Sequence, residues 1–136
     1  MTERAQEVLR LAGEQARELR HSFVGTEHIL LALFLEPEGS AAHVLASFGV
    51  SHAQVRTAVV RMMGLGIEAP EGELALTGPA QDVIDRARRE ASIRDQRQVG
   101  TEHILLALVH KRDGAATRIL LQLDADPAAI RAALPS

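Results

Sequence analysis

The chain of 136 residues contains no cysteine, tryptophan or tyrosine. Without cysteine it can form no disulfide, bind no metal through a thiolate and use no cysteine nucleophile. Long apolar runs are also missing: no stretch approaches the roughly 18 residues that span a bilayer, and the N-terminus carries charge where a signal peptide needs an apolar core. These absences predict a cytoplasmic protein that does not enter a membrane.

The charge pattern and the missing motifs argue against several classes of function. The net charge is −3 with both signs interspersed, which disfavours nucleic-acid binding. No nucleotide-binding glycine loop and no G-x-S-x-G motif occurs, and His28 and His103 lack the spacing of zinc hydrolases. We therefore expect no catalytic residue, no metal and no cofactor, so that the chain is not an enzyme. The alternative is acid–base chemistry by the two Glu-His pairs.

What the sequence does contain is an internal repeat. The string GTEHILLAL occupies residues 25–33 and returns unchanged at 100–108. At a constant offset of 75, residues 2–61 and 77–136 share 22 identities in 60 positions without a gap. Unrelated sequences would share about four, so the chain arose by duplication.

The repeat suggests a plan for the whole chain. Its length suits one domain, so we expect a single domain over 1–136. Repeat one covers 1–64 and repeat two covers 77–136. The segment 65–76 is a linker with glycine, proline and three glutamates, from which Ile67, Leu74 or Leu76 can pack back on the domain.

Apolar residues at helical spacing predict four helices in each repeat. The predicted N-terminal caps are Thr2, Thr26, Ser40, Ser51, Thr77, Thr101 and Asp126, with Gly114 ahead of the third helix of repeat two. The helices that follow Thr26 and Thr101 are apolar nearly all round, so neither repeat can bury its own helix alone. The sequence thus predicts an all-α fold of about eight helices, as two four-helix repeats related by approximate two-fold pseudo-symmetry around one core.

Charged residues of the fifth predicted helix form a regular pattern. Asp82–Arg86, Asp85–Arg89 and Glu90–Arg94 lie four residues apart with the acid first, which stabilises a helix by a few tenths of a kcal/mol per pair, about 0.2–0.5 each. We interpret this run as a solvated face and not as a ligand site.

Two glutamates of the doubled string are candidates for binding. Glu27 and Glu102 fall in the first turn of their helices, where the helix dipole stabilises a carboxylate. That role alone explains them without a ligand. The capped helix starts at Thr2 and Thr77 offer free N–H groups that attract anions. If each start lies near the glutamate of its own repeat, the pair suits a ligand that joins a guanidinium to an anion.

The run T-E-R-A-Q-E-V-L, the string H-S-F-V-G-T-E-H-I-L-L-A-L, the later E-G-S-A-A-x-V-L and their second copies resemble the N-terminal repeat domain of the Clp unfoldases, most closely the ClpC type. The resemblance implies a compact all-α module that recruits protein substrates and adaptors to an ATP-driven unfoldase working with the ClpP protease. It also implies cyclic-peptide ligands as possible partners. A free-standing homologue that acts as a decoy or sequesters the same ligands is the alternative.

The resemblance further implies two symmetric pockets for phosphorylated arginine. By motif position, Glu27 and Glu102 would take the guanidinium, while Thr2 and Thr77 would help to hold the phosphate. Repeat two begins with Thr77-Gly78-Pro79-Ala80 in place of the family's basic T-P-R-A pattern. The missing cation favours the pocket of repeat one.

Overall fold

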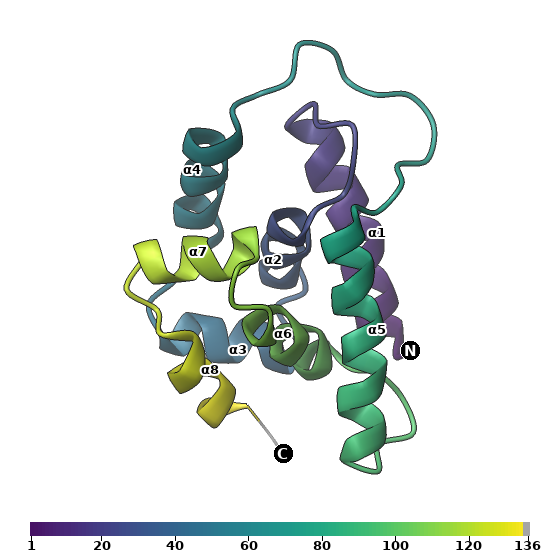
Figure 1. The fold of residues 1–136 in the computed structure, drawn as a ribbon, viewed down its shortest axis with the longest axis vertical. Coiled ribbons are helices and arrows are strands. Elements are labelled where there is room, and N and C mark those ends of the chain that lie inside the picture. The colour runs from purple at the N-terminus through teal and green to yellow at the C-terminus, as the bar shows by residue number, and fades with distance from the viewer. Residues whose placement is uncertain (135–136) are drawn as a thin grey trace.

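The computed structural model describes residues 1–134, and these residues form eight α-helices and no strand. The helices are α1 (Glu3–Glu18), α2 (Thr26–Phe34), α3 (Ser40–Ser47), α4 (His52–Met63), α5 (Gly78–Ile93), α6 (Thr101–His110), α7 (Ala115–Gln122) and α8 (Pro127–Ala133). Each helix of the second half begins 75 residues after its counterpart (Figure 1). The prediction of an all-α fold with eight helices in two repeats is confirmed. No helix of the described part is long and apolar enough to cross a membrane.

Four of the predicted helix caps are confirmed. The hydroxyl oxygens of Thr2 and Thr77 accept hydrogen bonds from the backbone N–H groups three residues later, both at 3.1 Å. Ser51 accepts from the Gln54 N–H, and Asp126 accepts from an N–H of the last helix. Each cap satisfies a donor that the helix itself leaves free.

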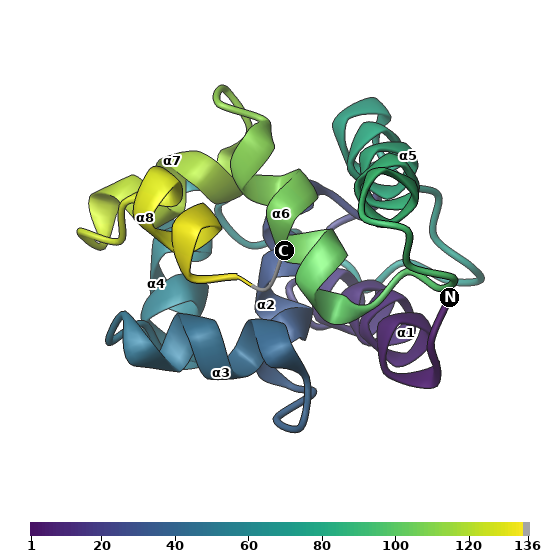
Figure 2. The same ribbon diagram turned by 90° about the horizontal axis from the view of Figure 1, so that it is seen from below.

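The two nearly identical helices α2 and α6 lie in the middle of the molecule (Figures 1 and 2). Every residue from Ile29 to Leu33 and from Ile104 to Val109 is buried. One apolar cluster joins residues of both repeats, as the all-round apolar pattern predicted. The repeats also interlock, because α3 packs against α6 and α7 packs against α2.

The sequence predicted that the threonines of the doubled string, Thr26 and Thr101, cap their own helices. This prediction is wrong. Gly25 and Gly100 occupy those cap positions. Thr26 accepts a hydrogen bond from the Ala116 N–H of α7, and Thr101 accepts from the Ala41 N–H of α3, both at 3.3 Å. The helices that receive these bonds, α3 and α7, have glycine as N-cap and no side-chain cap of their own. Each repeat therefore supplies a missing cap to the other.

Ser40 likewise does not cap α3, because it is already the first helical residue and Gly39 precedes it as the N-cap. A Cβ at residue 39 would lie 2.8 Å from the Thr101 hydroxyl oxygen. A side chain at this position would displace the cap that comes from the other repeat. Gly39 is thus required by the contact between the repeats.

The linker follows the surface and returns to the core at its end. Val24 and Leu76 form an isolated parallel bridge, and Leu74 and Leu76 pack against the core cluster, as predicted. Ile67 does not, since 90% of its surface is exposed. The Arg17 side chain donates to two carbonyl oxygens of the linker, those of residues 70 and 72, and so fastens its middle to α1.

Replacing Thr26 by valine tests the cap between the repeats. The change keeps the shape of the side chain but leaves the buried Ala116 N–H without an acceptor, so we expect the free energy of unfolding to fall by about 1–2 kcal/mol. Urea denaturation of Thr26→Val and of Thr26→Ser, which keeps the oxygen, measures it. A Thr26→Ser variant as unstable as Thr26→Val would contradict this role.

Candidate ligand-binding site

The first residues of the doubled string form the same small structure at the start of α2 and of α6. Each glutamate folds back over the preceding glycine: a Cβ at Gly25 would collide with the carboxylate of Glu27, and one at Gly100 with that of Glu102. Glycine leaves this space open, and any other residue would force the carboxylate out of its present position. The G-x-E spacing is therefore a geometric device for seating a carboxylate at a helix start.

The histidines of the string have a structural role. His28 Nδ1 accepts a hydrogen bond from the Gly25 N–H, and His103 Nδ1 accepts one from the Gly100 N–H, each at 2.8 Å. Both rings are buried. Each imidazole closes the first turn of its helix and fixes the loop that carries the glutamate.

The structure pairs the candidate residues across the repeats and not within them. The Thr2 N–H donates to the Val99 carbonyl oxygen at 3.0 Å, and the Thr77 N–H donates to the Val24 carbonyl oxygen at 2.9 Å. The start of α1 therefore lies beside the start of α6, and the start of α5 follows the strand-like segment that leads into α2. The predicted pairs, Thr2 with Glu27 and Thr77 with Glu102, are wrong because the loops ahead of α2 and α6 exchange partners.

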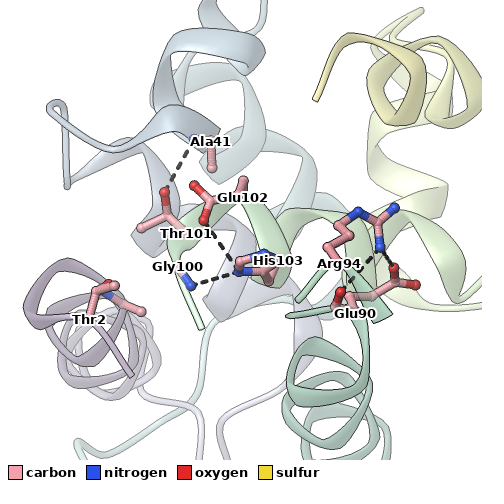
Figure 3. A network of polar contacts seen from close by, with 9 residues as sticks. Thr2, Ala41, Glu90, Arg94, Gly100, Thr101, Glu102 and His103 are labelled. Carbon is pink, nitrogen blue, oxygen red and sulfur yellow. Dashed lines mark hydrogen bonds and ion pairs between the residues drawn. The ribbon is translucent and has the colours of Figure 1, made fainter. Parts of the chain in front are cut away.

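A cavity of about 810 Å³ lies where α1 begins. Its lining includes Thr2, Arg4, Gly39, Thr101 and Glu102. Figure 3 shows Thr2, at the start of α1, on the side of the segment that carries Gly100, Thr101 and Glu102. The cavity combines the donor-rich start of a 16-residue helix with a carboxylate of the other repeat, which are the groups that suit a ligand joining a guanidinium to an anion.

The two glutamates differ in their access to solvent. The Glu102 side chain is 24% exposed, whereas that of Glu27 is 7% exposed. Burial raises the pKa of Glu27, while its own backbone N–H and the nearby His21 and Arg118 act in the opposite direction. The Glu27 carboxylate is therefore nearly closed off from solvent, whereas the Glu102 carboxylate is accessible to it.

The residues around the two helix starts differ as well. The Thr2 end has Glu3 and Arg4, and Arg4 lies 3.8 Å from Glu36 with 60% of its side chain exposed. At the Thr77 end the same positions are Gly78 and Pro79. Of the two helix starts, the one at Thr2 thus has an exposed cation, Arg4, in the same cavity as the accessible Glu102 carboxylate.

A chain of histidines closes the opposite side of the α2 start. His28 Nε2 lies 2.8 Å from His21 Nδ1, and His21 Nε2 lies 2.7 Å from the Gly64 carbonyl oxygen. Because His28 Nδ1 accepts from Gly25, a neutral His28 carries its proton on Nε2 and donates it to His21, which donates to Gly64. The chain joins the end of α4 to the start of α2. Repeat two has Gln96 at the equivalent of His21 and lacks it.

Glu90 is a buried polar residue, 2% exposed. The prediction that it belongs to a solvated face of the helix is wrong. Its carboxylate lies 2.8 Å from Arg86 and also pairs with Arg94 (Figure 3). Burial works to raise its pKa, but the two guanidinium groups lower it below the usual range. Among the predicted pairs of α5, only Glu90–Arg94 forms within the described residues.

The counterpart of Glu90 in repeat one is Gln15, which is also buried. Its Oε1 accepts a hydrogen bond from His52 Nε2 at 2.8 Å. Polarity at the same position of both repeats does not reveal burial by itself, because Gln6 and Gln81 are equivalent and both are exposed. The spacing of charges on one helix does not contain this information, since the partner helix decides what is buried.

Two interlocked four-helix repeats, with a polar cavity between the first helix of one and the central helix of the other, define a helical repeat domain. Among residues 1–134 no group of three or more histidine, aspartate or glutamate side chains is placed to hold a metal ion. The model of the family described as the Clp repeat (R) N-terminal domain matches residues 1–123. The chain belongs to this family, as its sequence motifs had indicated.

Known relatives agree with this assignment. The chain is 46% identical over 124 residues to the Clp protease ATP-binding subunit ClpC of Staphylococcus epidermidis, covering 91% of this chain and 15% of that protein. The chain spans about one sixth of the length of the curated relatives it matches, 15–16%.

Solved structures share its fold. The N-terminal domain of ClpD from Arabidopsis thaliana has a TM-score of 0.81 and 24% identity, covering 97% of this chain and 90% of that one. A ClpV N-domain solved as a complex with a VipB peptide has a TM-score of 0.75 and 19% identity, covering 96% and 82%. These identities establish the likeness of the fold.

The histidine chain predicts that acid destabilises the domain. Burial, with a smaller contribution from His21, lowers the pKa of His28 to about 4, compared with about 6.5 in an unfolded chain. The unfolded state therefore binds a proton below pH 6.5 that the folded state refuses until about pH 4. We expect this group to cost about 2 kcal/mol of unfolding free energy between pH 7.5 and pH 5.

Urea denaturation across this pH range measures the loss. A His28→Gln variant has no imidazole to titrate there, so its stability should depend less on pH by about the same 2 kcal/mol. The exposed His43 provides a matched control, and His43→Gln should leave the pH dependence unchanged. If the unfolding free energy depended on pH equally in wild type and His28→Gln, the low pKa of buried His28 would not be the cause of the acid sensitivity.

Proposed function

We propose that this domain is a non-catalytic binding module that captures protein substrates or adaptors for a Clp-type unfoldase. The proposed ligand is phosphorylated arginine, bound in the cavity between Thr2 and Glu102. The observation that carries the proposal is the meeting of an open carboxylate and the start of α1 in one cavity. A side chain with a guanidinium next to a phosphate needs these two groups at short range.

The chemistry of each half of the cavity matches one half of the ligand. The first turn of α1 has N–H groups without partners inside the helix, and its dipole favours a negative group. Arg4 adds a positive charge, and the Thr2 hydroxyl is free to donate its proton because its oxygen accepts from Ala5. On the other side, the Glu102 carboxylate suits a planar guanidinium.

Peptide binding by a related fold supports the proposal in general terms. The ClpV N-domain was solved in complex with a VipB peptide. The domain compared there differs in sequence, so it supports capture of a peptide and not a particular side chain. The choice of phosphoarginine rests on the groups in this cavity and on the family's motif.

We further propose that one site dominates and not two. The buried Glu27 and the Gly78-Pro79 start of α5 make the equivalent place near Thr77 a poor receptor for a charged group. Desolvating a phosphate or guanidinium there would cost free energy that no cation at residue 79 offsets. The sequence also favoured the helix start of repeat one, which has Arg4 where repeat two has Pro79. The glutamate that lines the same cavity as Thr2 is Glu102, from the other repeat.

Calorimetric titration with phosphoarginine, and with a short peptide that contains it, tests the site. We expect one equivalent to bind to the wild type and binding to weaken by about ten- to a hundredfold in Glu102→Gln, because a hydrogen bond to a charged partner is lost. Thr2→Val should also weaken it. Any tag belongs at the C-terminus, since Met1 lines the cavity.

Glu27→Gln is the matched control, because it makes the same change at the pseudo-equivalent position. It should bind as the wild type does. No heat with wild type would refute phosphoarginine as the ligand. Two equivalents, one lost in each glutamate variant, would refute the single dominant site while leaving the ligand in place.

A further inference from the structure

A second groove lies on the far side of repeat two, between the end of α6, the helix α7 and the start of α8. Its volume is about 430 Å³, and it shares no lining residue with the cavity at Thr2. Figure 2 shows α7 and α8 side by side next to α6. Val109, Leu121 and Pro127 are among its apolar residues. Leu121 is 54% exposed, although the preceding residues Ile119 and Leu120 are fully buried.

The rim of this groove is positively charged. Arg112 and Arg131 line it and are exposed, and within residues 1–134 neither side chain takes part in a hydrogen bond or an ion pair. His110 also lines the groove. Burial lowers the pKa of His110, and the charges of Arg86, Arg131 and Arg112 lower it further against the opposing effect of Glu90.

The lining contains one acidic residue. Asp126 caps α8 by accepting from the Ala128 N–H at 3.1 Å. The polar residue at the floor, Thr117, donates its hydroxyl proton to backbone oxygens of residues 108 and 111, so it offers little to a ligand. An apolar floor with free cations at its edge is therefore what this groove presents to solvent.

The internal repeat shows that these residues are not needed for the fold. Repeat one builds the same three helices with Leu35 at the position of His110, Pro37 at that of Arg112 and Ala46 at that of Leu121. Only Arg131 has an equivalent cation, Arg56. The combination of an exposed leucine with two arginines therefore occurs in repeat two and not in repeat one. The packing of the helices does not require it.

We propose that this groove is a docking site for an acidic, leucine-containing segment of a partner protein. An apolar side chain of the segment packs against Leu121 and Pro127, and flanking carboxylates pair with Arg112 and Arg131. The charge of the rim selects this occupant, because a basic segment would be repelled and an uncharged one would leave both arginines unpaired. The site is independent of phosphoarginine binding at Thr2.

Fluorescence anisotropy of the domain with a labelled peptide tests the proposal. The probe has central leucines flanked by aspartates, and a comparison probe has lysines in place of the aspartates. We expect saturable binding of the acidic probe only, weakened about fivefold by Arg131→Ala and about tenfold or more by Arg112→Ala with Arg131→Ala, because each rim pair contributes modestly. Leu121→Ala should weaken it about fivefold through lost apolar contact.

Charge reversal and a matched control make the outcome decisive. Arg131→Glu should abolish binding of the acidic probe and allow binding of the lysine probe. Arg56→Ala, the same change at the equivalent residue of repeat one, should bind as wild type does, and circular dichroism confirms that each variant is folded. Equal binding of both probes, or no effect of Arg131→Glu, would overturn the proposal. Self-association that Arg131→Glu abolishes would overturn it in favour of a second copy of this chain.

Discussion

The packing of α2 and α6 in the centre of the molecule is the constraint on which the other features depend. Both helices are apolar nearly all round, so each must be covered on every side, and neither repeat has enough helices to do so. The cover comes from the other repeat, through α7 on α2 and α3 on α6. The polar groups at the helix starts have to be satisfied in the same exchange, since a buried unpaired N–H is costly.

Most residues of the doubled string have a structural role at the start of the central helices. The glycine leaves room for the glutamate, the threonine caps a helix of the other repeat, and the histidine accepts from the glycine N–H. The apolar residues fill the core. Strict identity between the two copies thus has a structural cause at nearly every position. The glutamate is the exception, because its neighbours differ between the copies and so does its exposure.

Duplication supplies symmetric positions, and divergence gives them different uses. The Thr2 end has an arginine and an open carboxylate, while the Thr77 end has glycine, proline and a buried one. The histidine chain occurs only in repeat one, and the clamp of Glu90 by two arginines occurs only in repeat two. One repeat therefore acts as a built-in control for the other when a residue is assigned to folding or to binding.

The sequence by itself determined the helical class, the repeat, the buried central helices and most caps. These features depend on spacing along the chain, which a helix converts directly into a face or an end. Membership of the Clp repeat family was also visible in its motifs. The role of Thr26 and Thr101, the burial of Glu90 and the pairing of Thr2 with Glu102 were decided only by the tertiary structure. Each depends on which repeat contributes the neighbour, and two equivalent repeats offer two partners of identical local sequence.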